Sequence, residues 1–358
     1  MSVSTAETGR DVVLPEGAGH SLLVRDVVNE TRDAKTVVFD VPDELAERFR
    51  YRPGQFLTLR MPGWQAAARC YSLSSAPDLD RHLAVTVKRV ADGAVSNWMC
   101  DEVRAGDRIL VLPPSGRFVP RSLEEDLLLV AGGSGITPML SIIRSVLERG
   151  TGSVVLCYAN RDEHSVIFAE RLRELSERYP DRLSVSHLLE SVEGLPTEAR
   201  MRGLLGPFAG RDAAFLCGPE PFMDAAAAAL RDLGVDRERI VVERFVSLTG
   251  DPFEGTRPRS AEDGGEQGAR VTVDLDGQRH ELDWPREAHL LDVLRSAGLD
   301  APFSCREGAC SACACRVTAG RVTMTRNEVL EEEDLAEGLV LGCQALPATD
   351  VVALTYDE

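Results

Sequence analysis

The sequence has no long apolar run, no excess of positive charge and no internal repeat at a fixed period. Its longest apolar runs, such as Leu127–Ala131, are far shorter than the roughly 20 residues of a membrane-spanning helix. The net charge of −18 disfavours nucleic acid as a partner, because its phosphates would repel the chain. Met1–Arg10 contains no apolar stretch of the kind that secretory signals have. We therefore expect a soluble cytoplasmic protein with no membrane span.

The cysteine pattern lacks the second close pair that is common in structural zinc sites. Cys305, Cys310 and Cys313 are separated by four and then two residues, and Cys343 follows thirty residues later. This is the plant-type spacing for a [2Fe–2S] cluster, and we predict these four thiols as its ligands. Zinc and disulfides are the alternative interpretations, although nine cysteines, an odd number, suit a reducing cytoplasm. Cys315 is expected on the following strand, as a packing residue.

A chain of 358 residues is too long for one ordinary core. Composition and motif order divide it into residues 18–121, 122–250 and 269–358, with a linker at 251–268. The linker is rich in Asp, Glu, Gly, Pro and Ser, and we expect it to be flexible.

The first part predicts a small antiparallel barrel, because short runs of strand-forming residues alternate with turn residues. The expected strands are Ser21–Val28, Thr36–Val41, Gln55–Arg60, Tyr71–Ser74, Leu83–Val90 and Arg108–Leu112. Leu83, Val85 and Val87 alternate with Ala84 and Lys88, as in a strand with one buried face.

Arg69, Tyr71, Ser72 and Leu73 form a motif in this part. A guanidinium offers a fork of donors to a phosphate, and a tyrosine offers both a ring and a hydroxyl. The motif resembles the RxYS signature of the ferredoxin reductase-like flavin domain. The resemblance implies bound FAD, with Ser72 near the flavin N5. The alternative is an ordinary barrel strand with a surface arginine.

A helix is predicted from Gly93, shortly after Val87 and Lys88 end a strand. Gly93, Val95 and Ser96 would place a glycine, a hydroxyl and a helix N-terminus at one point, which suits a pyrophosphate. Ser96 could instead simply cap the helix. Together with the RxYS resemblance, these five residues are predicted to contact the flavin cofactor.

The second part begins with a continuous apolar strand, Leu127–Ala131, followed by Gly132, Gly133, Gly135 and Thr137 at the start of a helix. Strand, glycine turn and helix start form a phosphate-binding unit. The turn resembles the GxGxTP type of the ferredoxin reductase family, which implies that Thr137 lies near the nicotinamide. The alternative is a tight turn that needs glycine for geometry alone.

Further nucleotide contacts are expected at the carboxyl ends of later strands, where open α/β sheets bind ligands. Asn160, Arg161 and Asp162 follow one strand; Arg161 would suit a 2′-phosphate and Asp162 a ribose hydroxyl, or either could be a solvated loop charge. The family resemblance favours NADH.

Cys217, Gly218 and Pro219 resemble the family's CGPxxM turn, which implies that Cys217 lines the nicotinamide site. A buried structural cysteine is the alternative. Phe245 occupies the place where relatives bring a residue towards the flavin.

The third part predicts two strands joined at Asp276–Gly277, a helix at Leu290–Ala297 and the cysteine loop, as in the β-grasp fold of plant-type ferredoxins. An acidic run, residues 331–334, is either a solvated helix face or a surface that attracts a basic partner.

The order of flavin barrel, α/β nicotinamide domain and ferredoxin resembles the reductase components of 3-ketosteroid 9α-hydroxylases, through the cysteine loop and the ending Thr355–Glu358. The reductase of phenylacetyl-CoA epoxidation shares this order and is the second candidate. The resemblance implies NADH, FAD and a [2Fe–2S] cluster, a terminal Rieske-type oxygenase as partner, and Ser72, Thr137 and Cys217 as positioning residues for hydride transfer. A hypothesis from another class is a cluster-bearing redox sensor that never turns over.

Overall fold

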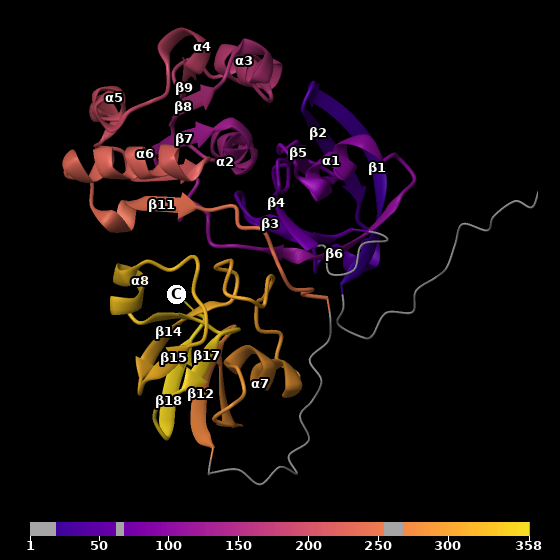
Figure 1. Ribbon diagram of the computed structural model, residues 1–358, viewed down its shortest axis with the longest axis vertical. Coiled ribbons are helices and arrows are strands. Elements are labelled where there is room, and N and C mark those ends of the chain that lie inside the picture. Colours follow the sequence, from indigo (N-terminus) through magenta and orange to yellow (C-terminus); the bar gives the residue numbers. More distant parts are fainter. Residues whose placement is uncertain (1–18, 62–67, 254–267, 358) are drawn as a thin grey trace, which may run out of the picture.

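The computed structural model describes residues 19–61, 68–253 and 268–357. The described residues form four sheets in three lobes, with the C-terminal lobe, which holds two of the sheets, below the other two lobes in Figure 1. We name them the barrel module, the α/β module and the C-terminal module. No helix in the described ranges is long and apolar enough to cross a membrane.

The barrel module is a six-stranded antiparallel sheet with the strand order β4-β3-β6-β1-β2-β5. Its elements are β1 (His20–Thr31), β2 (Ala34–Asp40), β3 (Phe56–Arg60), β4 (Ala68–Ser72), β5 (Leu83–Lys88), α1 (Ala94–Asp101) and β6 (Arg108–Ser115). A bridge between Leu73 and Val85 joins the two edge strands, so the sheet closes as predicted. Val85 and Val87 are buried as their alternation predicts, and Thr86 is buried as well, since its hydroxyl bonds to Thr36 and Ser74.

The α/β module is a five-stranded parallel sheet with the order β11-β10-β7-β8-β9. Its elements are β7 (Leu127–Gly132), α2 (Ile136–Arg149), β8 (Val154–Asn160), α3 (Ala169–Arg178), β9 (Leu183–Leu189), α4 (Glu190–Glu193), α5 (Glu198–Leu205), β10 (Ala213–Cys217), α6 (Glu220–Asp232) and β11 (Ile240–Glu243). Every residue of β7 is buried, because helices α2 and α3 pack on one face of the sheet and α5 and α6 on the other.

The C-terminal module has a mixed sheet with the order β13-β12-β18-β14-β16, in which β12 and β18 are parallel. Its elements are β12 (Ala269–Leu275), β13 (Gln278–Trp284), α7 (Leu290–Ser296), β14 (Ala314–Ala319), β15 (Val322–Met324), α8 (Glu332–Ala336), β16 (Leu339–Leu341), β17 (Ala345–Pro347) and β18 (Val351–Thr355). Helix α7 packs on this sheet through Leu290, Leu291 and Leu294, which gives the predicted β-grasp arrangement. Cys315 lies on β14 in the same core, as expected.

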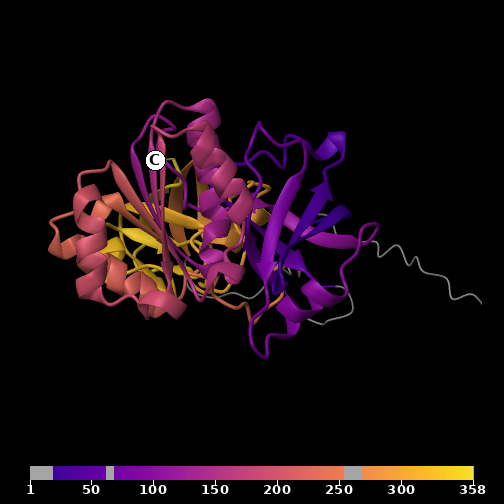
Figure 2. The ribbon, with the colours of Figure 1, turned by 90° about the horizontal axis from the view of Figure 1, so that it is seen from above.

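The C-terminal module contacts both other modules, and in the view from above it lies largely beneath the α/β module (Figure 2). The cysteine loop packs against the barrel in one apolar cluster. Glu307 accepts hydrogen bonds from the backbone of Thr249 and Gly250. The side chains of Asp251 and Phe253 are buried here, with Asp251 paired to Arg60 at 2.8 Å. The first residues of the predicted linker thus pack in this junction, residues 254–267 lie outside the described residues, and the flexibility of the linker stays a prediction.

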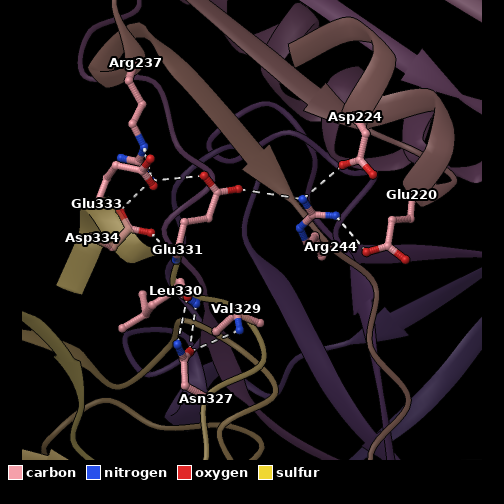
Figure 3. Close-up of polar contacts among 10 residues, drawn as sticks. All are labelled: Glu220, Asp224, Arg237, Arg244, Asn327, Val329, Leu330, Glu331, Glu333 and Asp334. Carbon is pink, nitrogen blue, oxygen red and sulfur yellow. Dashed lines mark hydrogen bonds and ion pairs between the residues drawn. The ribbon is translucent and has the colours of Figure 1, made fainter. Parts of the chain in front are cut away.

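Two arginines of the α/β module bind the acidic helix α8 (Figure 3). Arg237 lies 3.0 Å from Asp334 and 3.4 Å from Glu331, and Arg244 reaches Glu331 at 3.7 Å. Arg244 also pairs with Glu220 on α6. The acidic run thus has basic partners within its own chain.

Candidate redox site

A cavity of about 540 Å³ opens where the three modules meet. Six residues predicted to bind cofactors line it: Lys88, Gly132, Gly133, Gly218, Pro219 and Phe245. Six more lining residues were not expected from the sequence: Ser134, Glu220, Met223, Arg244, Val246 and Glu328. Residues of β5, β7 and β10 converge here because parallel strands end at one edge of their sheet and the barrel packs against that edge.

The glycine turn between β7 and α2 is pressed against the loop after β10. Gly133 has a φ of +53°, a conformation that L side chains rarely adopt. A Cβ on Gly135 would lie 2.0 Å from the carbonyl oxygen of Cys217. The Thr137 hydroxyl donates to the carbonyl of Ser134 at 3.0 Å and closes the turn. Gly132, Gly133 and Ser134 of this turn line the cavity, and this cradle of strand, glycine turn and helix start suits a nucleotide phosphate.

Asn160, at the end of β8, supplies a second sign of a ligand. Both polar atoms of its amide are buried, and among the described residues neither makes a hydrogen bond of normal geometry, although the Tyr158 hydroxyl is a nearby polar group. Such groups are rare because burying an unpaired amide costs free energy. Asn160 is not among the residues that line the cavity, and its contact with a bound dinucleotide stays a prediction.

The neighbouring charges have structural partners of their own. Arg161 pairs with Asp33 of the barrel at 2.7 Å. Asp162 accepts a hydrogen bond from the backbone N–H of Ser165 at 2.9 Å and so caps a short helical turn. Their roles toward a ribose or a phosphate remain predictions.

The flavin motif lies on β4 and at its end, outside the residues that line the cavity. The ring of Tyr71 packs on the barrel core, and Ser72 and Leu73 are buried. Arg69 donates to the carbonyl of Leu248 at 3.0 Å and so ties β4 to the segment after β11. Burial raises the pKa of Tyr71, so its hydroxyl is neutral.

At the predicted pyrophosphate site at the start of α1, the Ser96 hydroxyl makes its hydrogen bonds to nearby backbone groups. The Ser96 hydroxyl accepts from the N–H of Val90 at 3.1 Å and donates to the carbonyl of Gly93 at 3.4 Å. Val87 and Val95 are buried in the barrel core. The hydroxyl of Ser96 thus orders the turn before α1 but caps no helix N–H, because the N-cap is Gly93, and its role toward a pyrophosphate stays a prediction.

Cys217 and Glu243 are paired residues at the ends of β10 and β11. The pKa of Cys217 is raised well above its ordinary value, chiefly by burial and then by the charge of Glu243. Burial also raises the pKa of Glu243 to about 8, although the residue keeps some exposure. Cys217 is therefore a neutral thiol. Glu243 was not expected from the sequence, where its one available signal was its position two residues before Phe245.

The four predicted cluster ligands are all buried in the C-terminal module. The pKa of Cys305 is lowered because Cys310 and Cys343 hydrogen-bond to its sulfur, and the N–H of Ala309 donates to it at 3.3 Å. Gly308 has a φ of +77°, and a Cβ there would lie 2.8 Å from the carbonyl oxygen of Arg326. The backbone at Gly308 therefore passes close to its neighbours, as only a glycine allows.

The four predicted thiols contact one another: Cys310 and Cys343 hydrogen-bond with Cys305, and Cys313 hydrogen-bonds with Cys343. Within residues 19–61, 68–253 and 268–357, no three His, Cys, Asp or Glu side chains converge on a point where a single metal ion could sit. A [2Fe–2S] cluster is held by four thiolates that are shared between two irons, so it needs no such convergence.

Three family models match the chain in the predicted order. They are an oxidoreductase FAD-binding domain at residues 21–119, an oxidoreductase NAD-binding domain at 129–228 and a 2Fe-2S iron-sulfur cluster binding domain at 273–348. These matches establish FAD, NADH and a [2Fe–2S] cluster as the cofactors.

The chain is similar over nearly its whole length to known reductases. It is 58% identical to a 3-ketosteroid-9-alpha-monooxygenase ferredoxin reductase component from Mycolicibacterium smegmatis, over 94% of this chain and 97% of that protein. It is 37% identical to one component of the 1,2-phenylacetyl-CoA epoxidase from Escherichia coli, over 94% and 98%. The fold matches the solved structure of phthalate dioxygenase reductase with a TM-score of 0.55 and 24% identity, over 94% and 98%.

The three modules, their cofactors and the end-to-end similarity lead to one conclusion. The protein is an NADH-dependent oxidoreductase that acts with a terminal oxygenase, and it belongs to the family of 3-ketosteroid-9-alpha-monooxygenase ferredoxin reductase components.

Proposed function

We propose that this protein takes electrons from NADH and delivers them, one at a time, to a Rieske-type oxygenase that hydroxylates 3-ketosteroids at C9, in the cytoplasm. The observation that carries the steroid assignment is the 58% identity across 94% of the chain, against 37% for the component of the epoxidase. The bound FAD and [2Fe–2S] cluster supply the conversion of a two-electron hydride donor into single electrons.

The residues of this chain hold and orient these groups. The glycine turn and the Cys217–Gly218 loop form the phosphate cradle, and Asn160, at the end of the neighbouring strand β8, offers a buried amide. We assign Thr137 and Cys217 the positioning of the nicotinamide, and Ser72 that of the flavin. Neutral side chains beside the nicotinamide suit hydride transfer, because a fixed charge there would favour either the oxidised or the reduced form of the nicotinamide. Cys217 meets this requirement, since burial raises its pKa.

The test is a reconstitution with NADH, a 3-ketosteroid, this protein and a 3-ketosteroid oxygenase component. We expect 9α-hydroxylated product, identified by mass spectrometry, to form in step with NADH consumption. A parallel reaction with the oxygenase components of the phenylacetyl-CoA epoxidase measures the second candidate. Product in that reaction alone would overturn the steroid assignment.

Reduction of ferricyanide by NADH separates a reductase from a redox sensor. We expect rapid turnover, since a sensor has no need to pass electrons continuously. Slow ferricyanide reduction by protein that carries its full FAD and iron would contradict the proposed function.

A further inference from the structure

A buried hydrogen-bonded contact joins the barrel module to the cysteine loop. The hydroxyl oxygens of Thr58 and Ser304 lie 2.5 Å apart, although the residues are 246 positions apart in the sequence. The sulfur of Cys70 lies 3.5 Å from the Thr58 hydroxyl and 3.7 Å from that of Ser304. Thr58 and Ser304 are each 1% exposed, so this contact is closed to solvent.

The contact connects the two redox motifs through covalent neighbours. Cys70 stands between Arg69 and Tyr71 in the flavin motif, and Ser304 immediately precedes the cluster ligand Cys305. Thr58 and Cys70 are directly paired on β3 and β4, so both side chains lie on one face of the barrel sheet. That face is the one that meets the cysteine loop.

Apolar residues surround the contact on all three sides of the junction. Phe56, Ala68 and Leu112 come from the barrel, Leu248 and Phe253 from the segment after β11, and Ala309 and Ala312 from the cysteine loop. In such apolar surroundings each hydroxyl depends on the other for its hydrogen bond. If the modules slid past each other by one residue, both hydroxyls would stay buried without a partner, which costs free energy. Apolar packing alone tolerates sliding, whereas this hydrogen bond fixes the register.

We propose that Thr58, Cys70 and Ser304 are positioning residues for electron transfer between the flavin and the cluster. They hold the cluster loop in van der Waals contact with the flavin strand, so that the electron crosses through this dry junction. Each crossing oxidises reduced FAD by one electron and reduces the cluster by one. NADH supplies the pair. The cluster passes its electron to the oxygenase between the two crossings, after which FAD is oxidised again and the proton that came with the hydride is released to solvent. This inference rests on the order of electron flow in the proposed function.

Single substitutions test the junction in the full-length protein loaded with FAD and cluster. Ser304→Ala and Thr58→Val each remove the bond. We expect each to slow cluster reduction about tenfold in anaerobic stopped-flow, as the loss of one buried hydrogen bond would weaken the aligned contact. Reduction of the flavin by NADH should stay unchanged, and so should the electron paramagnetic resonance signal of the cluster. This combination separates positioning from damage to either cofactor.

Thr36→Val is the matched control, because Thr36 also makes a buried hydroxyl–hydroxyl bond in the barrel, to Thr86 at 2.7 Å, but on β2, which is three strands from β3 in the sheet order. It should leave cluster reduction at the wild-type rate. Wild-type rates in both Ser304→Ala and Thr58→Val, with full cofactor content, would overturn the proposal. So would an equal slowing in Thr36→Val.

A disulfide across the junction tests the proposal without relying on a variant that loses activity. Ser304→Cys would place a second thiol beside Cys70, and oxidation with diamide should join the two modules by a disulfide, detected by mass spectrometry of peptides. The locked protein should reduce its cluster at least as fast as the same variant after dithiothreitol. A locked protein whose cluster stays oxidised would contradict the junction. The reconstitution with the oxygenase is a separate experiment, so failure there leaves this result intact.

Discussion

Arg237 and Asp334 form an ion pair of 3.0 Å across the boundary between the α/β module and helix α8 of the C-terminal module. Glu331 and Glu333 lie within 3.4 and 3.9 Å of the same guanidinium. The acidic run that could have attracted an external partner is therefore engaged within the chain. An external basic surface that binds α8 would have to compete with Arg237 and Arg244.

Removing the guanidinium should loosen the C-terminal module. We expect Arg237→Ala to weaken docking by about 1 kcal/mol, since the side chain is partly exposed and salt screens such pairs. Faster hydrogen exchange of α8 would report it, and about 1 M salt should have the same effect on the wild type. Arg173→Ala is the control, because Arg173 pairs with Glu170 and Glu177 inside α3. No difference between the two variants would show that the network does not hold the module.

The buried carboxyl of Glu243 should make stability depend on pH. Its pKa is raised from 4.5 to about 8, so between these values the folded protein keeps a proton that the unfolded chain has lost. Stability therefore falls as pH rises through this window and levels off above about pH 8. Between about pH 6 and 8 the loss should be up to about 2 kcal/mol. Glu243→Gln should remove this slope in thermal unfolding, whereas Glu177→Gln, on the surface of α3, should keep it. An unchanged slope in Glu243→Gln would contradict the assignment.

Two glycines give a matched test of the nucleotide turn. Gly135→Ala places a Cβ 2.0 Å from the carbonyl oxygen of Cys217 and must push the two loops apart. We expect at least about tenfold weaker NADH binding and a loss of about 2 kcal/mol in stability. Gly203→Ala meets nothing within 4 Å inside α5 and should be neutral or stabilising by up to about 1 kcal/mol. Titration of each variant with NADH checks both. Normal binding by Gly135→Ala would place the nucleotide elsewhere.

A pair of cysteines separates cluster ligation from packing. Cys343→Ser should lower iron content and abolish reduction of the oxygenase, while ferricyanide reduction by the flavin is retained. Cys315→Ser should keep its iron, because Cys315 lies on β14 in the sheet core. Iron analysis and electron paramagnetic resonance measure both. Loss of the cluster in Cys315→Ser but not in Cys343→Ser would reverse the ligand assignment.

Local patterns in the sequence predicted the modules and the kinds of site. Alternating residues such as Leu83 and Val85 indicated barrel strands, and the run at Leu127–Ala131 indicated a strand buried on both faces. The cysteine spacing predicted a four-thiol set, and the structure gathers these thiols in one buried place. Each of these signals depends on neighbours in the chain, so no tertiary information was needed to recognise it.

Other features have no local signal. Glu243 is an ordinary acidic residue in the sequence, and its raised pKa comes from the atoms that fold around it. The ion pair between Arg161 and Asp33 likewise depends on how the barrel packs against the α/β module.

The sequence by itself determined the cofactor set and the order of the modules, since each motif needs only its own short segment. Only the tertiary structure decided how the modules meet: that Thr58 contacts Ser304, and that Arg237 holds α8. The physical reason is that these contacts join surfaces built from distant segments. Burial and geometry decide whether such surfaces fit together, and this fit produces no periodic pattern in the sequence.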